Sequence, residues 1–303
     1  MKIIFAGSPE YAVPTLNALY ETGGVIGVIT QPDKPVGRKK VLTPTAVKAR
    51  AKQLDLPVYD FNKIREHVEE VKALGADAMF TCAYGQLLTQ DILDCFPQGV
   101  WNLHASLLPK FRGASPIQSA ILAGETHTGV TVMKTELSLD TGDMLLVKRC
   151  EIGDMDCAEL SKTLSRLSAE AAGDAYRLLE SGQTQLLMQD DAKATFCKKI
   201  NKGDGKINFD NSPEVICRLI RAFNPEPLAY CMQNGNVLNI LRAQPFGDRG
   251  EPGTVICADK RGFAVACNGG AVLITQILPA GGKKMNAADY VNGRKLKAGD
   301  RLD

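Results

Sequence analysis

The sequence predicts a two-part protein: an α/β domain with a doubly wound, mostly parallel sheet, followed by a small β domain. In the first half, apolar strand-like runs alternate with segments whose apolar residues recur at helical spacing. This is the pattern of a parallel sheet covered by helices. One of the runs, residues 77–83, suits a strand that is buried on both faces. After about Asp190, short strand-like runs separated by glycine-bearing turns predict a small barrel or sandwich.

The elements of the first half are justified by their spacing. Residues 2–6 form a short apolar strand that ends at Gly7, and residues 9–20 follow with apolar residues at helical spacing. The further expected elements are strands 25–30, 77–83, 99–105 and 129–135, and helices 44–54, 116–123 and 156–179. In doubly wound sheets, ligand sites lie at the carboxyl ends of strands, which is where residues 102–106 fall.

The second half begins with a polar, lysine-bearing segment that ends in Asn201-Lys-Gly-Asp-Gly205 and is typical of a linker. We therefore expect domains at residues 1–189 and 206–303, joined by a linker at 190–205. The expected elements of the second domain are a helix at 212–223 and strands at 237–242, 253–258, 263–267 and 271–278.

Charge is unevenly distributed along the 303 residues, a length that suits two domains. Residues 1–191 carry 19 basic and 24 acidic side chains, a net charge of −5, whereas residues 192–303 carry 17 and 10, a net charge of +7. A basic half can attract a polyanion such as RNA. A charge of this size is also compatible with an ordinary solvated face.

Cysteine usage and hydropathy predict a cytoplasmic protein without a membrane partner. The nine cysteines include no Cys-x-x-Cys pair, which argues against a zinc ribbon or a thioredoxin-like site. They are expected to be reduced and mostly buried. No apolar run approaches the ~18 residues of a membrane span, and the N-terminus leads directly into a strand without a signal-peptide layout.

Asn102, His104 and Asp140 are the candidate catalytic residues. Because side chains alternate along a strand, Asn102 and His104 project from the same face. An amide and an imidazole on one face can together hold a carbonyl oxygen as it becomes an oxyanion. A carboxylate such as Asp140 could orient the imidazole and raise its proton affinity. The pattern indicates acyl transfer without a serine or cysteine nucleophile, and no metal is expected.

Residues 102–118 (NLHASLLPKFRGASPIQ) closely resemble the signature of the folate-dependent formyltransferases. In that family the catalytic trio is an asparagine and a histidine two apart on a strand, with an aspartate from a later loop, and Asn102, His104 and Asp140 match it. Three further segments, residues 5–9, 31–38 and 221–225, resemble the members that use initiator methionyl-tRNA as acceptor. Two departures from the family pattern stand out. Glu226 occupies a position where the resemblance leads us to expect an aromatic residue, and the basic loop at residues 34–40 is about one residue shorter than expected.

The resemblance implies the substrates and their contacts. The formyl donor is expected to be 10-formyltetrahydrofolate, the acceptor initiator methionyl-tRNA, and the second domain an OB-like barrel that helps to hold the tRNA. We expect the protein to be monomeric. The expected folate-binding residues are Ser106, Leu107, Leu108, Pro109, Ala83, Tyr84, Gly85 and Asp143. The expected tRNA-binding residues are Arg38, Lys39 and Lys40, in a loop with four positive charges.

Other functions stay open at this point. A formyltransferase acting on a nucleotide-sugar amine can share the two-domain layout, and only the basic loop and the basic second half speak against it. An enzyme acting on glycinamide ribonucleotide would lack the second domain. A formyl-folate hydrolase would not need a basic second domain, and a non-catalytic RNA-binding protein would not need the intact trio.

Overall fold

The computed structural model describes residues 1–37, 39–294 and 296–303. The chain folds into two compact units. The first unit comprises Met1–Pro116, His127–Glu151 and Ser161–Cys197, and the second comprises Ile117–Thr126, Ile152–Leu160 and Lys198–Asp303. The predicted linker 190–205 is thus shared between the units, with the division after Cys197.

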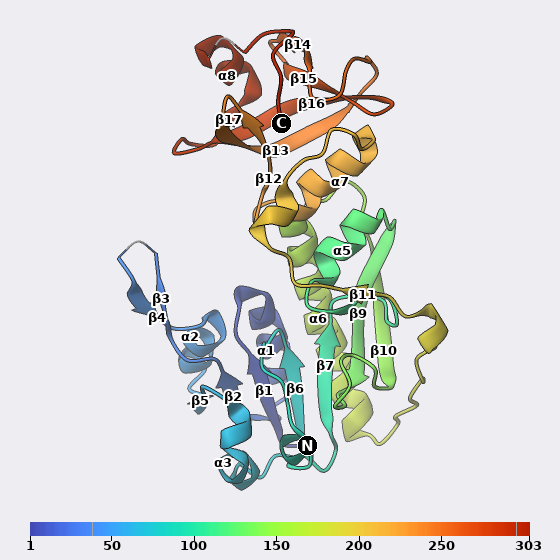
Figure 1. Cartoon of the computed structure of the whole chain (residues 1–303). Helices are drawn as coiled ribbons and strands as arrows, with labels where there is room; N and C mark the ends of the chain where they lie inside the picture. The colour runs from blue at the N-terminus through green and yellow to red at the C-terminus, as the bar shows by residue number, and fades with distance from the viewer. Residues whose placement is uncertain (38, 295) are drawn as a thin grey trace. The chain divides into compact units, whose positions relative to one another are not determined.

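The first unit is built around a seven-stranded sheet in the order β10-β9-β7-β6-β1-β2-β5 (Figure 1). Its strands are β1 (Ile3–Gly7), β2 (Val25–Thr30), β5 (Val58–Asp60), β6 (Ala78–Cys82), β7 (Val100–His104), β9 (His127–Lys134) and β10 (Met144–Glu151). The strands from β5 to β7 are parallel, whereas β9 is antiparallel to both of its neighbours. The predicted mostly parallel sheet is confirmed.

Helices cover both faces of this sheet, as expected of a doubly wound fold. One face packs against η2 (Ile64–Glu66), α3 (Val68–Ala73) and α4 (Gln90–Leu93). The apolar cluster there contains Ile4, Ala6, Ile29, Ile64, Val71, Met79, Ile92 and Val100. Ile3 and Phe5 point to the opposite face of β1 and are fully buried as well. The structure also contains α1 (Val13–Tyr20), α2 (Ala46–Gln53), α5 (Pro116–Ala123) and α6 (Cys157–Glu180).

The second unit contains an antiparallel sheet, which confirms the predicted small β domain. Its strands are β12 (Ala229–Gln233), β13 (Asn236–Phe246), β14 (Val255–Asp259), β15 (Gly262–Cys267), β16 (Gly270–Pro279) and β17 (Met285–Asn286). Helix α7 (Pro213–Phe223) contributes Ile216 and Ile220 to the core, where they join Phe263, Val272 and Ile274 of the sheet. Helix α8 (Ala287–Arg294) follows β17.

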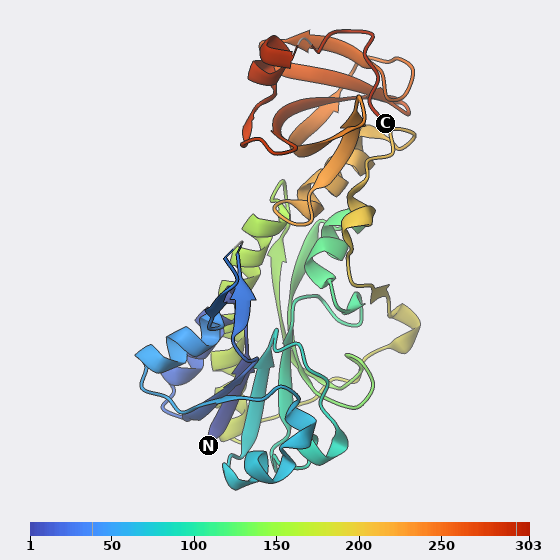
Figure 2. The same ribbon diagram turned by 60° about the vertical axis from the view of Figure 1, so that its left-hand side comes forward.

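Three strands of three residues each in the first unit carry no usable periodicity in the sequence. One is β5, and the other two, β3 (Lys34–Val36) and β4 (Val41–Thr43), form an exposed hairpin that projects from the sheet (Figure 2). Each has only three residues, too few to show an alternation. The base of the hairpin is held by Lys48 of α2, whose Nζ lies 2.7 Å from Asp33 Oδ1 and 2.6 Å from Asp60 Oδ2.

The cysteines are all free thiols, and five of the nine are buried. Burial raises the pKa of Cys82 and of Cys231 to about 12, so these thiols stay protonated at neutral pH. No helix within the described ranges is long and apolar enough to cross a membrane.

Candidate active site

Strand β7 presents Asn102 and His104 at its carboxyl end, as the alternation predicts. Thr81 on the neighbouring strand β6 is the register partner of Asn102, and its hydroxyl donates to Asn102 Oδ1 at 2.9 Å. This bond fixes the orientation of the amide, because the oxygen is held by a donor. Asn102 Nδ2 makes no hydrogen bond to another described residue, so its two N–H groups can bind an external oxygen.

The His104 ring is 6% exposed and is fastened at one nitrogen. Its Nε2 lies 2.9 Å from the carbonyl oxygen of Phe111, a residue with a φ of +60°. Since a carbonyl can only accept, Nε2 carries the proton of this bond. In the neutral ring Nδ1 then bears the lone pair. The nitrogen that can exchange a proton during a reaction is therefore Nδ1.

Asp140 faces this nitrogen from the turn between β9 and β10. Its Oδ2 lies 3.7 Å from His104 Nδ1 and accepts a hydrogen bond from the backbone N–H of Gly113 at 2.8 Å. Its own φ is +54°, a left-handed conformation that an aspartate tolerates better than most residues. Two residues later, Gly142 passes so close to β9 that an added Cβ would lie 1.8 Å from the Lys134 carbonyl oxygen.

These groups form an arrangement suited to carbonyl chemistry. An amide donor and an imidazole stand side by side on one strand, and a carboxylate lies beside the imidazole nitrogen that can take or give a proton. Donors held in place before the reaction stabilise a developing oxyanion more than mobile water can. The charged imidazole would be stabilised by the adjacent carboxylate.

Both halves of the chain match known families. Residues 1–176 match the family model described as formyl transferase, and residues 199–295 match the model described as formyl transferase, C-terminal domain. The chain belongs to the formyl transferase family. The family resemblance indicated by residues 102–118 is confirmed.

Two similar methionyl-tRNA formyltransferases align with the whole length of this formyl transferase. A methionyl-tRNA formyltransferase of Geobacter sulfurreducens is 39% identical over 306 residues, covering 100% of this chain and 96% of that protein. One of Neisseria gonorrhoeae is 40% identical over 308 residues, covering all of both chains. An N-formyltransferase from Helicobacter canadensis, solved in complex with folinic acid and dTDP-3-aminofucose, superposes with a TM-score of 0.72. At 19% identity, covering 92% of this chain and 100% of that chain, it shows the shared fold alone.

The turn after β7 holds four of the predicted folate-binding residues of this formyl transferase. Ser106 is fully buried, and its hydroxyl donates to the Lys110 carbonyl oxygen at 2.6 Å. Leu108 packs with two methionines of β9 and β10, and Leu107 and Pro109 are half-buried. The contacts of Ser106 and Leu108 are internal to the protein, so a folate-binding role for the turn stays a prediction.

The other predicted folate-binding residues lie in two loops. Ala83 and Gly85 are exposed after β6, whereas the Tyr84 side chain is buried in the apolar cluster, and burial raises its pKa. The Tyr84 carbonyl oxygen accepts a hydrogen bond from Gln31 Nε2 at 2.9 Å. Asp143 is half-buried and follows the Asp140 turn directly. These roles also stay predictions.

Two of the predicted tRNA-binding residues, Lys39 and Lys40, are exposed in the turn of the β3–β4 hairpin. The third, Arg38, lies outside the described residues.

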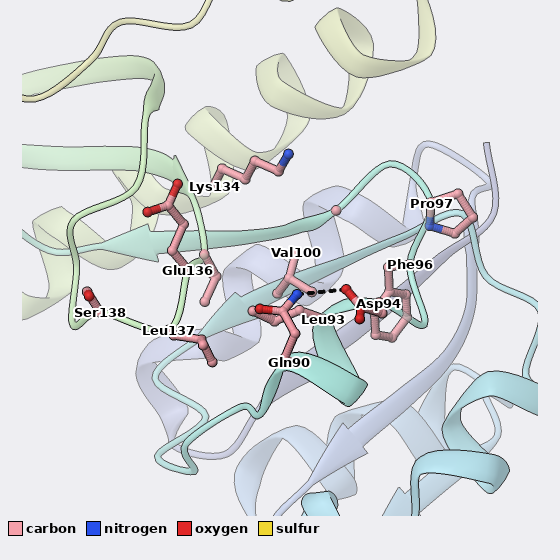
Figure 3. Close-up of a pocket in the computed structure, with 12 residues that line it drawn as sticks. Gln90, Leu93, Asp94, Phe96, Pro97, Val100, Lys134, Glu136, Leu137 and Ser138 are labelled. Atoms are coloured by element: carbon pink, nitrogen blue, oxygen red, sulfur yellow. Dashed lines mark hydrogen bonds between the residues drawn. The ribbon is translucent and has the colours of Figure 1, made fainter.

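A cavity of about 640 Å³ opens between α4 and the loop 135–138 (Figure 3). Leu93, Phe96 and Val100 line its apolar side. The loop contributes Thr135, whose hydroxyl is buried without a hydrogen-bond partner in the described part of the chain. The sequence does not predict this cavity, because α4 is only four residues long and loop 135–138 contains no recognisable motif.

Proposed function

We propose that this formyl transferase moves the formyl group of 10-formyltetrahydrofolate to the α-amino group of initiator methionyl-tRNA. The observation that carries the proposal is the juxtaposition of Asn102, His104 and Asp140 at the end of β7. It occurs in a chain whose whole length aligns at 39–40% identity with methionyl-tRNA formyltransferases.

The chemistry divides among the three side chains as follows. The acceptor amine attacks the formyl carbon and forms a tetrahedral centre with a negatively charged oxygen. Asn102 Nδ2 and a protonated His104 Nδ1 donate to that oxygen. Asp140 stabilises the imidazolium and accepts the proton that the amine sheds. As the oxyanion collapses, the carbon–nitrogen bond to the folate breaks, and that nitrogen takes up a proton.

The cavity between α4 and loop 135–138 fits the ring of the folate substrate. Strand β7 runs from Val100, on the cavity wall, to His104, and four residues at about 3.3 Å each span roughly 13 Å. A pterin ring seated in the cavity, with its arm to N10 lying along β7, would carry the formyl group toward His104. The apolar wall would contact the ring face, and the unpartnered Thr135 hydroxyl would bond its polar edge.

We expect Leu137→Asp to raise the KM for 10-formyltetrahydrofolate about tenfold while the KM for methionyl-tRNA stays unchanged. Leu137 lines the cavity and is 66% exposed, so the protein should tolerate the charge. Losing the burial of a leucine side chain against a ligand costs about 1.5 kcal/mol, which is about tenfold in affinity. Initial-rate kinetics with each substrate varied in turn measure both constants. Val147→Asp, on the exposed side of β10, is the control and should leave both constants unchanged. An unchanged folate KM in Leu137→Asp would place the ring elsewhere.

For the tRNA, we expect Arg38→Ala and the pair Lys39→Ala and Lys40→Ala to weaken catalysis on methionyl-tRNA and leave folate binding intact. Each lost phosphate contact should make the slope of log affinity against log salt less steep by about one. Filter binding of tRNA over a salt series measures the slope. Lys52→Ala, an exposed lysine of α2 outside the hairpin, is the matched control. Loss of folate affinity with intact tRNA binding would assign the hairpin to the other substrate.

The acceptor itself is tested by one assay with the intact protein. Incubation with 10-formyltetrahydrofolate and charged initiator methionyl-tRNA should yield N-formylmethionine on the tRNA. Formylation of a nucleotide-sugar amine without formylation of the tRNA would overturn the proposal, and so would hydrolysis of the donor alone.

A further inference from the structure

The segment after α6 returns to the active site before the chain enters the second unit. Leu187 forms an isolated antiparallel bridge with Met144, the first residue of β10. Two residues later the Gln189 side chain, which is 7% exposed, reaches the turn that carries Asp140. Its Nε2 donates to the carbonyl oxygens of Asp140 and Gly142 at 2.9 and 2.8 Å.

The other end of this amide is held by a buried arginine. Arg112 is 3% exposed, and its Nε and one terminal nitrogen donate to Gln189 Oε1 at 3.1 and 2.9 Å. The same terminal nitrogen also pairs with Asp191 Oδ1 at 2.7 Å. If the Gln189 amide were flipped, its N–H groups would face the N–H groups of the guanidinium, and its oxygen would face two carbonyl oxygens. The arginine therefore sets which way the amide of Gln189 points.

This contact acts on a backbone that would otherwise relax. Asp140 has a φ of +54°, and a left-handed residue other than glycine persists only where its surroundings hold it. Two of the contacts that hold it come from neighbouring residues, since Gly113 N–H binds the carboxylate and Arg112 orients Gln189. The short strand β8 (Arg112–Gly113) thus supports Asp140 twice, once directly and once through Gln189.

We propose that Gln189, oriented by Arg112, is a positioning residue that fixes the Asp140 carboxylate relative to His104 during formyl transfer. The proposal rests on the function proposed above. Gln189 does not touch the reacting atoms. It acts by satisfying two carbonyl groups of the turn, one of which belongs to Asp140 itself.

The test compares Gln189→Glu in two backgrounds. This change keeps the size of the side chain and an acceptor oxygen for Arg112, with which the glutamate would form a new ion pair, but it removes both N–H donors. We expect kcat for methionyl-tRNA formylation to fall at least about tenfold with both KM values within twofold, since a misplacement of about 1 Å can cost up to a hundredfold. In an Asp140→Ala background the same change should lower the residual kcat less than twofold, because Gln189 acts only through Asp140.

A matched control and a second variant complete the experiment. Gln185→Glu makes the same chemical change at an exposed position of the same segment and should leave kcat unchanged. Gln189→Met removes the donors without adding charge, and should reproduce the loss if Gln189→Glu does not fold. A wild-type kcat in the folded variant, or an equal fold-loss in both backgrounds, would overturn the positioning role. If the wild-type protein forms no formylmethionyl-tRNA, it is the proposed function that fails.

Discussion

Replacing His104 by alanine should lower the turnover of formyl transfer by at least about a hundredfold. The ring is buried, held by the Phe111 carbonyl oxygen, and presents Nδ1 beside Asp140. Its removal deletes a donor to the oxyanion, and losing one such donor costs roughly 3–4 kcal/mol. Asn102→Ala and Asp140→Ala should each lose at least about a hundredfold as well. Single-turnover formylation of methionyl-tRNA at saturating folate measures the effect.

The effect should be confined to chemistry. None of the three substitutions removes a phosphate contact, so tRNA affinity in a filter-binding assay should stay at its wild-type value. His127→Ala, at a half-exposed position on β9, is the control and should keep normal turnover. Near-normal turnover in His104→Ala would remove the imidazole from the mechanism.

The part of the site that follows from local spacing could be predicted from the sequence. Asn102 and His104 lie two apart on a strand, so the strand period alone puts them on one face. The alternation of apolar runs and helical spacing likewise predicted the strands that form the centre of the sheet, because buried strands must be apolar. Asp140 was placed by resemblance to a family, since nothing in its neighbours fixes its distance from His104.

The groups that orient the trio could not be predicted in this way. Thr81 meets Asn102 through the pairing of two parallel strands, and Gln189 meets Asp140 across 49 positions of the sequence. Such contacts depend on register and on loop path, which a single sequence does not specify. Phe111 holds the His104 ring through its backbone carbonyl oxygen, and because every residue has such an oxygen, the sequence cannot indicate this contact.

The predicted folate-binding residues illustrate the same limit. Ser106 is polar and follows β7, so the sequence favours a ligand contact, and in the structure its hydroxyl donates to the Lys110 carbonyl oxygen. Leu93, Phe96 and Val100 line the cavity proposed for the folate ring, and in the sequence they look like ordinary core residues. From the sequence alone, an apolar residue that lines a pocket cannot be distinguished from one that packs in the core.

Gly142→Ala should lower kcat about a hundredfold, nearly as much as the loss of Asp140 itself. An added Cβ would lie 1.8 Å from the Lys134 carbonyl oxygen, and this neighbour is backbone in a paired strand, so the turn has to move. Asp140 is two residues away, and its carboxylate lies 3.7 Å from His104 Nδ1. A shift of about 1 Å at a reacting group can cost a hundredfold. The measurement is kcat with both substrates saturating.

Gly173→Ala is the control for this prediction, because the nearest atom to its added Cβ is the end of an arginine side chain at 3.7 Å within α6. Alanine favours a helix over glycine by about 1 kcal/mol, so this variant should keep full activity and melt no earlier than the wild type. A Gly142→Ala protein with wild-type kcat would show that the turn can shift without carrying the carboxylate away. The close approach at Gly142 would then be a matter of packing alone, and Asp140 would be held by its bond to the Gly113 backbone N–H.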